Sequence, residues 1–350
     1  MAGLIMACGW LGVARCEEIA EVAPGTVCHQ TVWSILALTV MFAVAVPNYR
    51  LASRWSYAGF VTMLLLLTAV YFFAPVNGAH RWIRAGGVGF QPSEFAKIAF
   101  VVALARYLAY RDTGRQFSGL VAPLAMTLVP LWLILKEPDL GTSLVFVPVL
   151  LAMTLAAGAR LPHLVAIILL GVATIPALWS QMSGDQRSRV TALWEQNLPR
   201  QSPTPAGYHL HQAKRMFALG GWRGSAIETD VDDAAIDRRV PEPHTDSIFS
   251  VLGERYGIIG CGIVLLLYFL LVWRGLAIAQ ETREAFGRLL VVGVMAMIAF
   301  QAAVNTGMLA GLFPITGLPL PLISYGGSGL IANALGLGLV VNVGSRPGYQ

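Results

Sequence analysis

The sequence has few charged residues. Only 12% of its 350 residues are Asp, Glu, Lys or Arg, whereas soluble domains carry about 25%. This scarcity excludes a soluble globular class. The net charge of +5 is small. In a membrane protein it bears on orientation in the bilayer, so we expect no nucleic-acid partner.

Cysteines are few and several common motifs are absent. The chain has 4 cysteines, without a Cys-x-x-Cys pair and without the spacing of a zinc site. Cys16 and Cys28 would share the first loop outside the membrane, where a disulfide and two unpaired small residues are both open. The run Gly326-Gly327-Ser328-Gly329 lacks the Lys-Ser/Thr ending of a P-loop. These patterns therefore indicate neither a zinc site nor a P-loop.

Long apolar runs dominate the sequence instead. Hydrophobic residues make up 56% of the chain, and runs of the ~20 residues that span a bilayer recur along it. We read them at 33–49, 55–74, 94–110, 118–135, 139–158, 161–180, 247–273, 288–311 and 319–343, with a shorter candidate at 2–14. The short apolar run at 2–14 has no basic region before it, so we expect no signal peptide. The predicted fold is an all-α polytopic membrane protein of about ten transmembrane helices, in which residues 1–350 form a single membrane domain.

Arginines gather in alternate loops between these runs. They are Arg50, Arg54, Arg106, Arg111, Arg115, Arg160, Arg274, Arg283 and Arg288. If the helices alternate in direction, all of these loops lie on one side, which the positive-inside rule makes cytoplasmic. Residues 181–245 then form a large extracytoplasmic loop between helices 7 and 8. Such long loops are usually functional or disordered.

Three acids stand where apolar helices are predicted to begin on the outer side. They are Glu94, Asp139 and Asp246. An ionisable group near membrane depth is a candidate functional residue. Each could instead serve as a helix cap that complements the helix dipole, and for Asp246 the preceding Thr245 suits the N-cap position. Both interpretations are open from the residues alone.

Basic residues on the outer side indicate an anionic ligand. Arg81 lies there against the positive-inside trend, and Lys97 falls inside an apolar helix on the same face as Glu94. A lipid phosphate or pyrophosphate would suit such cations. For Lys136, at a helix end on the same side, we favour unspecific contact with lipid head groups.

Three further patterns concern the C-terminal part of the chain. Gln301 and Asn305 share one helix face, which favours hydrogen bonding between helices. The segment 314–321 contains three prolines and cannot be regular helix. Irregular backbone at membrane depth occurs where protein or a water-filled cavity surrounds it. The step from Gly253 to Gly257 suits close helix packing.

Several of these stretches together resemble the SEDS family (shape, elongation, division and sporulation), the RodA/FtsW-like proteins. They are Gly78-Ala79-His80-Arg81-Trp82-Ile83, Gln91-Pro92-Ser93-Glu94 with Lys97, Pro138-Asp139-Leu140-Gly141-Thr142, Pro241-Glu242 with His244-Thr245-Asp246, and Leu318-Pro319-Leu320-Pro321 through Ser324-Tyr325-Gly326-Gly327-Ser328. Two positions depart from the family pattern. Ser247 stands where Phe is usual, and Glu254-Arg255 stands where family members often have Glu-Glu.

The resemblance implies a multi-pass protein of the bacterial inner (cytoplasmic) membrane that acts as a peptidoglycan glycosyltransferase. Its substrate would be lipid II, the undecaprenyl-pyrophosphate-linked disaccharide-pentapeptide, and its partner a class B penicillin-binding protein. The family's proposed catalytic acid corresponds to Asp246. The alternatives are a lipid II flippase, which intramembrane charges and broken helices would also suit, and a non-catalytic scaffold for the penicillin-binding protein.

The chemistry of such a reaction suggests roles for further residues. The predicted substrate-binding residues are Arg81, Trp82, Glu94, Lys97, Asp139, Glu242 and His244. Arg81 and Lys97 would hold the phosphates, Glu94 would orient Lys97, and Trp82 would stack on a sugar or isoprenoid or simply anchor the interface. No cofactor is predicted with certainty, although a divalent cation, Mg²⁺ or Mn²⁺, could be held by Asp246 or Glu242. A helix dipole would lower the pKa of Asp246 and burial would raise it, and the sequence does not decide between them.

Overall fold

The structure, a computed structural model, describes residues 1–19, 22–75, 79–85, 88–110, 117–195, 205–225 and 242–346. Four residues named above lie outside this described part: Gly78, Arg111, Arg115 and Pro241.

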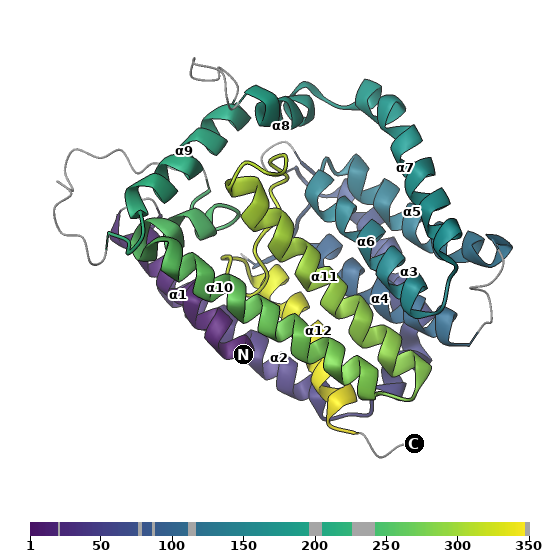
Figure 1. Cartoon of the computed structure of the whole chain (residues 1–350). Helices are drawn as coiled ribbons and strands as arrows, with labels where there is room; N and C mark the ends of the chain where they lie inside the picture. The colour runs from purple at the N-terminus through teal and green to yellow at the C-terminus, as the bar shows by residue number, and fades with distance from the viewer. Residues whose placement is uncertain are drawn as a thin grey trace. The chain divides into compact units, whose positions relative to one another are not determined.

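The described chain is almost entirely helical (Figure 1). The α-helices are α1 (Ala2–Glu18), α2 (Thr26–Ala45), α3 (Arg50–Ala69), α4 (Pro92–Ala109), α5 (Val121–Lys136), α6 (Leu140–Ala156), α7 (Leu161–Gln181), α8 (Gly184–Glu195), α9 (Pro205–Gly220), α10 (Ile248–Glu281), α11 (Ala285–Leu309) and α12 (Gly327–Gly344). Two short 3-10 helices (Val70–Phe72 and Phe117–Leu120) and an antiparallel hairpin of β1 (Ile83–Ala85) and β2 (Val88–Phe90) complete the described elements.

Each predicted apolar run overlaps one helix, with ends that differ by several residues. Helix α10 continues to Glu281, past the predicted end at 273. Helix α12 begins only at Gly327 because the prolines before it leave the backbone non-helical. The predicted loop 181–245 is not loop throughout, since it contains α8 and α9. Both are more polar than the other helices, so a search for apolar runs does not find them.

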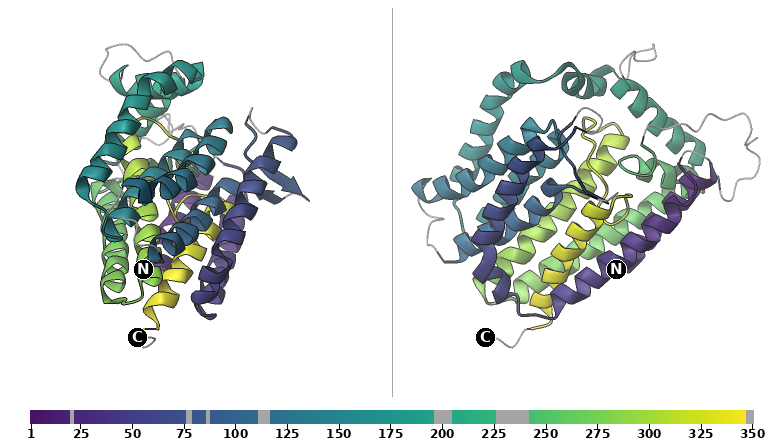
Figure 2. Two further views of the ribbon diagram at one scale, coloured as in Figure 1. Left: turned by 90° about the vertical axis from the view of Figure 1, so that its right-hand side faces the viewer. Right: turned by 180° about the vertical axis from the view of Figure 1, so that it is seen from behind.

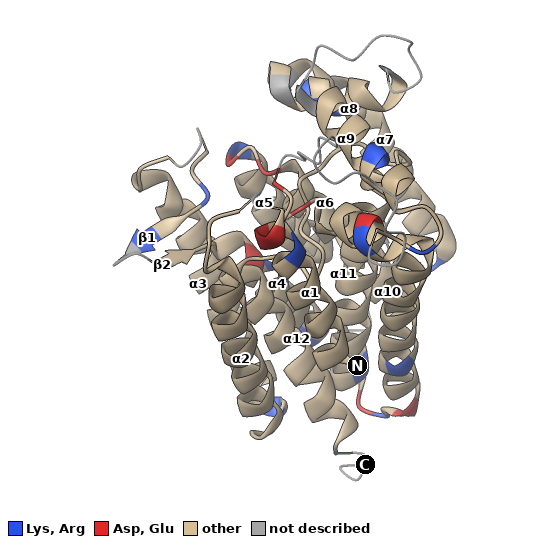
Figure 3. Cartoon of the chain, turned by 90° about the vertical axis from the view of Figure 1, so that its left-hand side faces the viewer, with Lys and Arg blue, Asp and Glu red and all other residues tan. Residues whose placement is uncertain are grey.

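The composition of the helices makes this a multi-pass membrane protein. Among the described residues, 5 helices are long and apolar enough to cross a membrane, and three apolar helices are shorter. Figure 3 shows charged residues mainly near helix ends and in loops, and α2 carries none along its whole length. Such a distribution matches helices whose middle faces hydrocarbon.

The chain divides into two compact units, which are described separately. The first comprises Met1–Ile35, Ala177–Leu271 and Gln301–Gly326, and the second comprises Leu36–Pro176, Val272–Phe300 and Gly327–Gln350. The sequence-based expectation of a single membrane domain over residues 1–350 stays a prediction.

In the first unit, α1 packs against the start of α10. A side chain on Gly12 would meet Ile248 and Leu252, so the absence of one allows the two helices to approach closely. Cys16 lies beside them in a buried cluster with Met216 and Val251. Cys28 is exposed, and no disulfide joins it to Cys16, both of which are described residues.

A break in α10 connects this helix to the turn that follows α9. Gly257 has φ 66°, inside the helix, and this left-handed conformation favours glycine. Beyond the break, the backbone N–H groups of Ile258 and Ile259 donate to the carbonyls of Gly221 (3.0 Å) and Trp222 (3.4 Å). A Cβ on Gly220 would lie 1.9 Å from the Gly253 carbonyl oxygen. The prediction of close packing at Gly253 and Gly257 is confirmed.

The second unit is built around α4. Helices α3, α5, α6 and α12 all contact it, and most of its residues are buried. Phe100 of α4 and Phe146 of α6 form an aromatic pair with ring centroids 5.1 Å apart. The β1–β2 hairpin lies near the C-terminal end of α3 (Figure 2), where the rings of Tyr71 and His80 are 6.4 Å apart. A buried helix α4 explains how Glu94 and Lys97 come to lie in the interior.

Candidate active site

Asp246 lies in a turn formed by residues 242–247, directly before helix α10. The helix begins at Ile248, so Ser247 is the residue that precedes it and the prediction of Thr245 as the N-cap is wrong. The hydroxyl of Ser247 instead lies 3.0 Å from Nε2 of His209 on α9. Asp246 therefore lies two residues before the first helical residue, outside the N-cap position.

The backbone around Asp246 is fixed by donors from two other segments of the first unit. Asn305 of α11 donates from Nδ2 to the carbonyl of Asp246 (2.8 Å) and to that of Leu318 (2.7 Å). The N–H of Tyr325 donates to the carbonyl of His244 (2.8 Å), and the Ser324 hydroxyl donates to the carbonyl of Thr245. Hydrogen bonding by Asn305 was expected, but its partners are loop carbonyls rather than another helix. The irregular 318–326 segment thus holds the turn that carries Asp246.

The carboxylate of Asp246 has an unusually high pKa. Burial raises the pKa of Asp246 to about 7, and the nearby Glu242 charge acts in the same direction. A backbone hydrogen bond, the charge of Arg189 and the Thr245 hydroxyl oppose this rise. The residue as a whole is half-buried, while its carboxyl group is desolvated. Burial outweighs the lowering influences, the point that the sequence left open.

Arg189 of α8 is a functional candidate that sequence reasoning missed. A Cβ built on Gly317 (φ +69°) would lie 3.6 Å from Oδ2 of Asp246 and 3.7 Å from Nη1 of Arg189. The two charged groups therefore approach the same glycine from different segments of the first unit. The sequence offered only a weak signal, an arginine within a polar loop, because nothing there predicted that α8 would bring it to Asp246.

Glu242 and His244 occupy the same turn as Asp246. The Thr245 hydroxyl lies 3.4 Å from Oε2 of Glu242 and 3.4 Å from Oδ1 of Asp246, so both carboxylates lie beside one hydroxyl. The His244 ring packs on Tyr325, with centroids 5.2 Å apart, and burial lowers the pKa of His244. His244 is therefore mostly neutral at pH 7.

The described residues do not form a complete metal site. No three His, Cys, Asp or Glu side chains come together within the described part of the chain. Mg²⁺ is usually held by one or two carboxylates, with substrate phosphates and waters completing its shell. The adjacent carboxylates of Glu242 and Asp246 fit this kind of partial site. They would supply two protein ligands to a divalent cation that arrives with a phosphorylated substrate.

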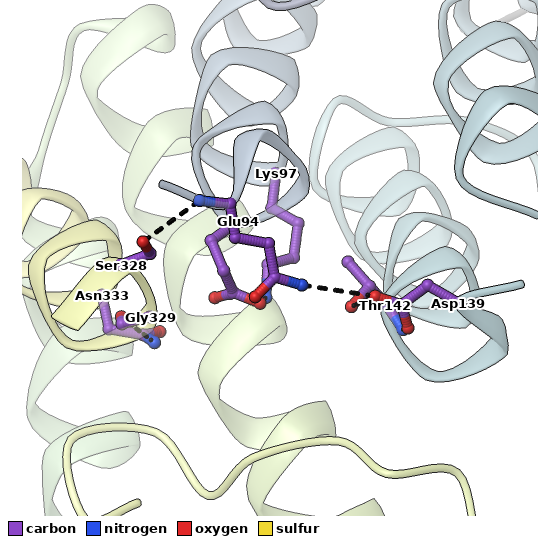
Figure 4. A network of polar contacts seen from close by, with 8 residues as sticks. Glu94, Lys97, Asp139, Thr142, Ser328, Gly329 and Asn333 are labelled. Carbon is purple, nitrogen blue, oxygen red and sulfur yellow. Dashed lines mark hydrogen bonds and ion pairs between the residues drawn. The ribbon is translucent and has the colours of Figure 1, made fainter. Parts of the chain in front are cut away.

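A second polar group lies in the second unit, around α4 (Figure 4). Lys97 donates from Nζ to both oxygens of Glu94, at 2.9 and 3.0 Å, and each residue is only 2% exposed. Gly329 of α12 lies beside this pair, since a Cβ there would be 3.4 Å from Oε2 of Glu94. The predicted pairing of the two residues on one helix face is confirmed, and it neutralises both charges.

Asp139 is linked to this group but acts as a helix cap. Its carboxylate accepts hydrogen bonds from the backbone N–H (3.1 Å) and the hydroxyl (2.9 Å) of Thr142, at the start of α6. Nε2 of Gln91 donates to it at 3.4 Å, and Ser328 of α12 lies 3.2 Å from the Gln91 N–H. The capping interpretation is confirmed, and contact of Asp139 with a substrate stays a prediction.

Arg81 and Trp82 lie on the approach to the hairpin of the second unit. The Arg81 guanidinium donates to the carbonyls of Glu137 (Nε, 2.9 Å) and Pro138. These contacts satisfy part of its donor set, and its side chain is still partly exposed. Trp82 packs over Gly89 of β2, where a Cβ would come within 3.1 Å of the indole. Arg81 can offer its remaining donors to an anion.

Glu137, beside Arg81, was not singled out as a site residue. It is 0% exposed, and neither carboxylate oxygen has a hydrogen-bond partner among the described residues. Burial raises the pKa of Glu137 to about 8, the charge of Asp139 acts with it and that of Arg81 acts against it. The carboxyl group is therefore mostly protonated at pH 7. The sequence shows this acid between Lys136 and Pro138 but does not reveal its burial.

Comparison with known proteins identifies the family. The family model described as FtsW/RodA/SpoVE, cell cycle protein, matches residues 1–347. The peptidoglycan glycosyltransferase MrdB of Escherichia coli K12 is 36% identical over 310 residues, which cover 88% of this chain and 82% of MrdB.

Two solved structures are also similar along the full chain. One comes from work on the structural coordination of polymerization and crosslinking by a peptidoglycan synthase complex. It has a TM-score of 0.84 and 31% identity and covers 100% of this chain and 97% of the other. The crystal structure of the rod shape determining protein RodA of Thermus thermophilus has a TM-score of 0.73 and 29% identity, covering 100% of this chain and 95% of RodA. The chain therefore belongs to the FtsW/RodA/SpoVE family.

Proposed function

We propose that this protein is a peptidoglycan glycosyltransferase that polymerises lipid II into glycan strands at the outer face of the bacterial cytoplasmic membrane. Its family and the names of its relatives support this class of enzyme. The observation that carries the assignment is Asp246. Its carboxylate has a pKa of about 7, its backbone is held by Asn305 and Ser324, and a cation, Arg189, lies near the same glycine, Gly317.

Asp246 would act as the general base. The reaction transfers the proton of the 4-hydroxyl of the acceptor sugar to the Asp246 carboxylate while that oxygen bonds to the anomeric carbon of the donor. The bond from this carbon to the pyrophosphate breaks on the opposite face, and undecaprenyl pyrophosphate leaves. A base whose pKa is close to the working pH is the most effective, and such a group contributes ~10²–10⁴-fold in rate.

Arg189 would stabilise negative charge near the reacting groups. It keeps a fraction of Asp246 ionised at neutral pH, and its guanidinium matches the geometry of phosphate oxygens. In the second unit we propose that Arg81 and Lys97 bind the lipid-linked pyrophosphate, that Glu94 orients Lys97, and that Trp82 and Asp139 line the substrate's path. Glu242 and His244 would contact the sugars beside Asp246. If a divalent cation takes part, it would neutralise pyrophosphate charge.

We further propose ten membrane spans, formed by α1–α7 and α10–α12. Helices α8 and α9 then belong to an extracytoplasmic loop over 181–245, which puts Arg189 and Asp246 on the side where lipid II is polymerised. A class B penicillin-binding protein would be the partner. The similarity to a chain from a synthase complex that coordinates polymerization and crosslinking supports this choice.

The test is polymer formation from lipid II by the purified protein in vesicles, with and without a class B penicillin-binding protein. We expect glycan strands from the wild type and none from Asp246→Ala, with equal amounts of inserted protein. If the wild type moved labelled lipid II across the vesicle but made no polymer, the protein would be a flippase. If Asp246→Asn supported normal cell-wall synthesis in place of the wild type, a scaffold role would replace the enzyme assignment.

A further inference from the structure

A basic cavity lies in the second unit, away from every residue assigned above. It has a volume of 480 Å³ and lies between the start of α3 and the end of α4. Its lining residues are Arg50, Ser53, Arg54, Arg106, Tyr110 and Glu284. We propose that this cavity binds the phosphate head group of an anionic phospholipid of the cytoplasmic leaflet.

The charges that line the cavity do not balance. Three arginines face one glutamate, and that glutamate already has partners. Oε2 of Glu284 lies 3.5 Å from Nε of Arg50 and accepts a hydrogen bond from the hydroxyl of Tyr49. Among the described residues, two of these positive charges are therefore left without a carboxylate partner, a number that suits a phosphate group.

Arg106 is held in place, and no carboxylate of the described residues forms an ion pair with it. Its Nη1 donates to the carbonyls of Ser53 and Arg54, the second at 2.9 Å. Its guanidinium also lies over the ring of Tyr57, 5.1 Å from the centroid. These contacts fix the plane of the guanidinium, and its other nitrogens remain available to a ligand.

Arg54 differs from Arg106 in its exposure and its contacts. Its side chain is exposed, and within the described chain no carboxylate forms an ion pair with it. Since it lines the cavity together with Arg106, the two guanidinium groups can approach one phosphate from different helices. Arg54 is also the lining arginine whose loss disturbs fewest contacts within the protein.

The position of the cavity selects a lipid rather than a soluble anion. The candidate membrane span of α3 begins at Arg50 itself, so the cavity lies at the level of the head groups. Tyr110, which is 69% exposed, stands at its rim, and tyrosine is enriched at the membrane interface. By the positive-inside rule this side is cytoplasmic, and basic pockets between helices on that side suit anionic head groups.

The test measures lipid retention by native mass spectrometry of the full-length protein. Wild type, Arg54→Gln and Arg274→Gln would each be titrated with phosphatidylglycerol and with phosphatidylcholine. Arg274 is a matched control, since it is an exposed arginine of the second unit on the same predicted side and does not line the cavity. We expect phosphatidylglycerol to be preferred by the wild type and by Arg274→Gln, and to bind roughly tenfold more weakly to Arg54→Gln.

Three results would overturn the proposal. Equal retention of phosphatidylglycerol by wild type and Arg54→Gln would exclude the cavity as its site. An equal loss in Arg274→Gln would mean that any surface arginine attracts the lipid. Displacement of the lipid by inorganic phosphate at matched concentration would identify a site for free phosphate instead.

Discussion

Replacing Arg189 by Gln tests whether its charge sets the working pH of Asp246. The two groups approach Gly317 from opposite segments, and a Cβ there would lie 3.6 Å from Oδ2 of Asp246 and 3.7 Å from Nη1 of Arg189. These two distances put the charged atoms at most about 7 Å apart. At about 7 Å and an effective dielectric constant of ~20, opposite charges attract by ~2 kcal/mol. That energy equals about 1.5 pKa units, and partial exposure of both groups to water reduces it to about one.

The expected effect follows from the sign of this interaction. Arg189 favours the ionised carboxylate, so its removal raises the pKa of Asp246 from about 7 to about 8. Since the base must be ionised, the acid limb of the pH profile of kcat/KM moves up by the same amount. At pH 7 the rate should fall roughly fivefold, and near pH 9 most of that loss should disappear.

The assay is lipid II polymerisation measured as kcat/KM from pH 5.5 to 9.5 at constant ionic strength. Arg189→Lys keeps the charge and should leave the limb within a few tenths of a unit of the wild type. Arg187→Gln removes a charge from the same helix, where Arg187 donates to the carbonyls of Trp179 and Ser180, and should not move the limb. A limb that stays in place in Arg189→Gln would refute the coupling between Arg189 and Asp246.

Two stability predictions concern the first unit. The buried pair of Arg15 and Glu254 is 3.1 Å apart, with side chains 7% and 0% exposed, so Glu254→Gln should lower the stability by ~3–5 kcal/mol in detergent unfolding. The control Glu18→Gln removes a 56% exposed partner of the same arginine and should cost under about 1 kcal/mol. Equal losses of stability in the two variants would contradict the argument that the buried partner matters more. Gly257→Ala should cost roughly 2 kcal/mol or more, because its φ is 66° and a Cβ would meet the Trp222 carbonyl oxygen at 2.5 Å. Gly262→Ala, in the same helix with open space around it, should leave the stability nearly unchanged. A similar loss of stability in Gly262→Ala would contradict the argument from the backbone conformation and contacts of Gly257.

The positions of the apolar helices could be predicted from the sequence because hydrocarbon selects their composition directly. Every apolar run overlaps one helix. Their ends were less accurate where local chemistry rather than hydropathy decides them. Helix α12 starts late because of Pro319 and Pro321.

The candidate site was predictable in its motifs and not in its electrostatics. The pairing of Glu94 with Lys97 follows from their spacing on one helix. The pKa values of Asp246 and Glu137 depend on burial, which a single sequence does not reveal. Arg189 reaches Asp246 through the fold of α8, a polar helix within what had been predicted as a loop. The electrostatics of the site therefore depend on contacts between distant segments, which residue spacing does not predict.

The rate of Asp246→Asn tests the central claim most directly, since it removes the base while keeping the size of the side chain. The measurement compares kcat for lipid II polymerisation with the Kd for lipid II, in protein whose unfolding temperature matches the wild type. Our account predicts a fall in kcat of ~10²–10⁴-fold with little change in Kd. A variant that polymerises lipid II at the wild-type rate would show that Asp246 is not the general base.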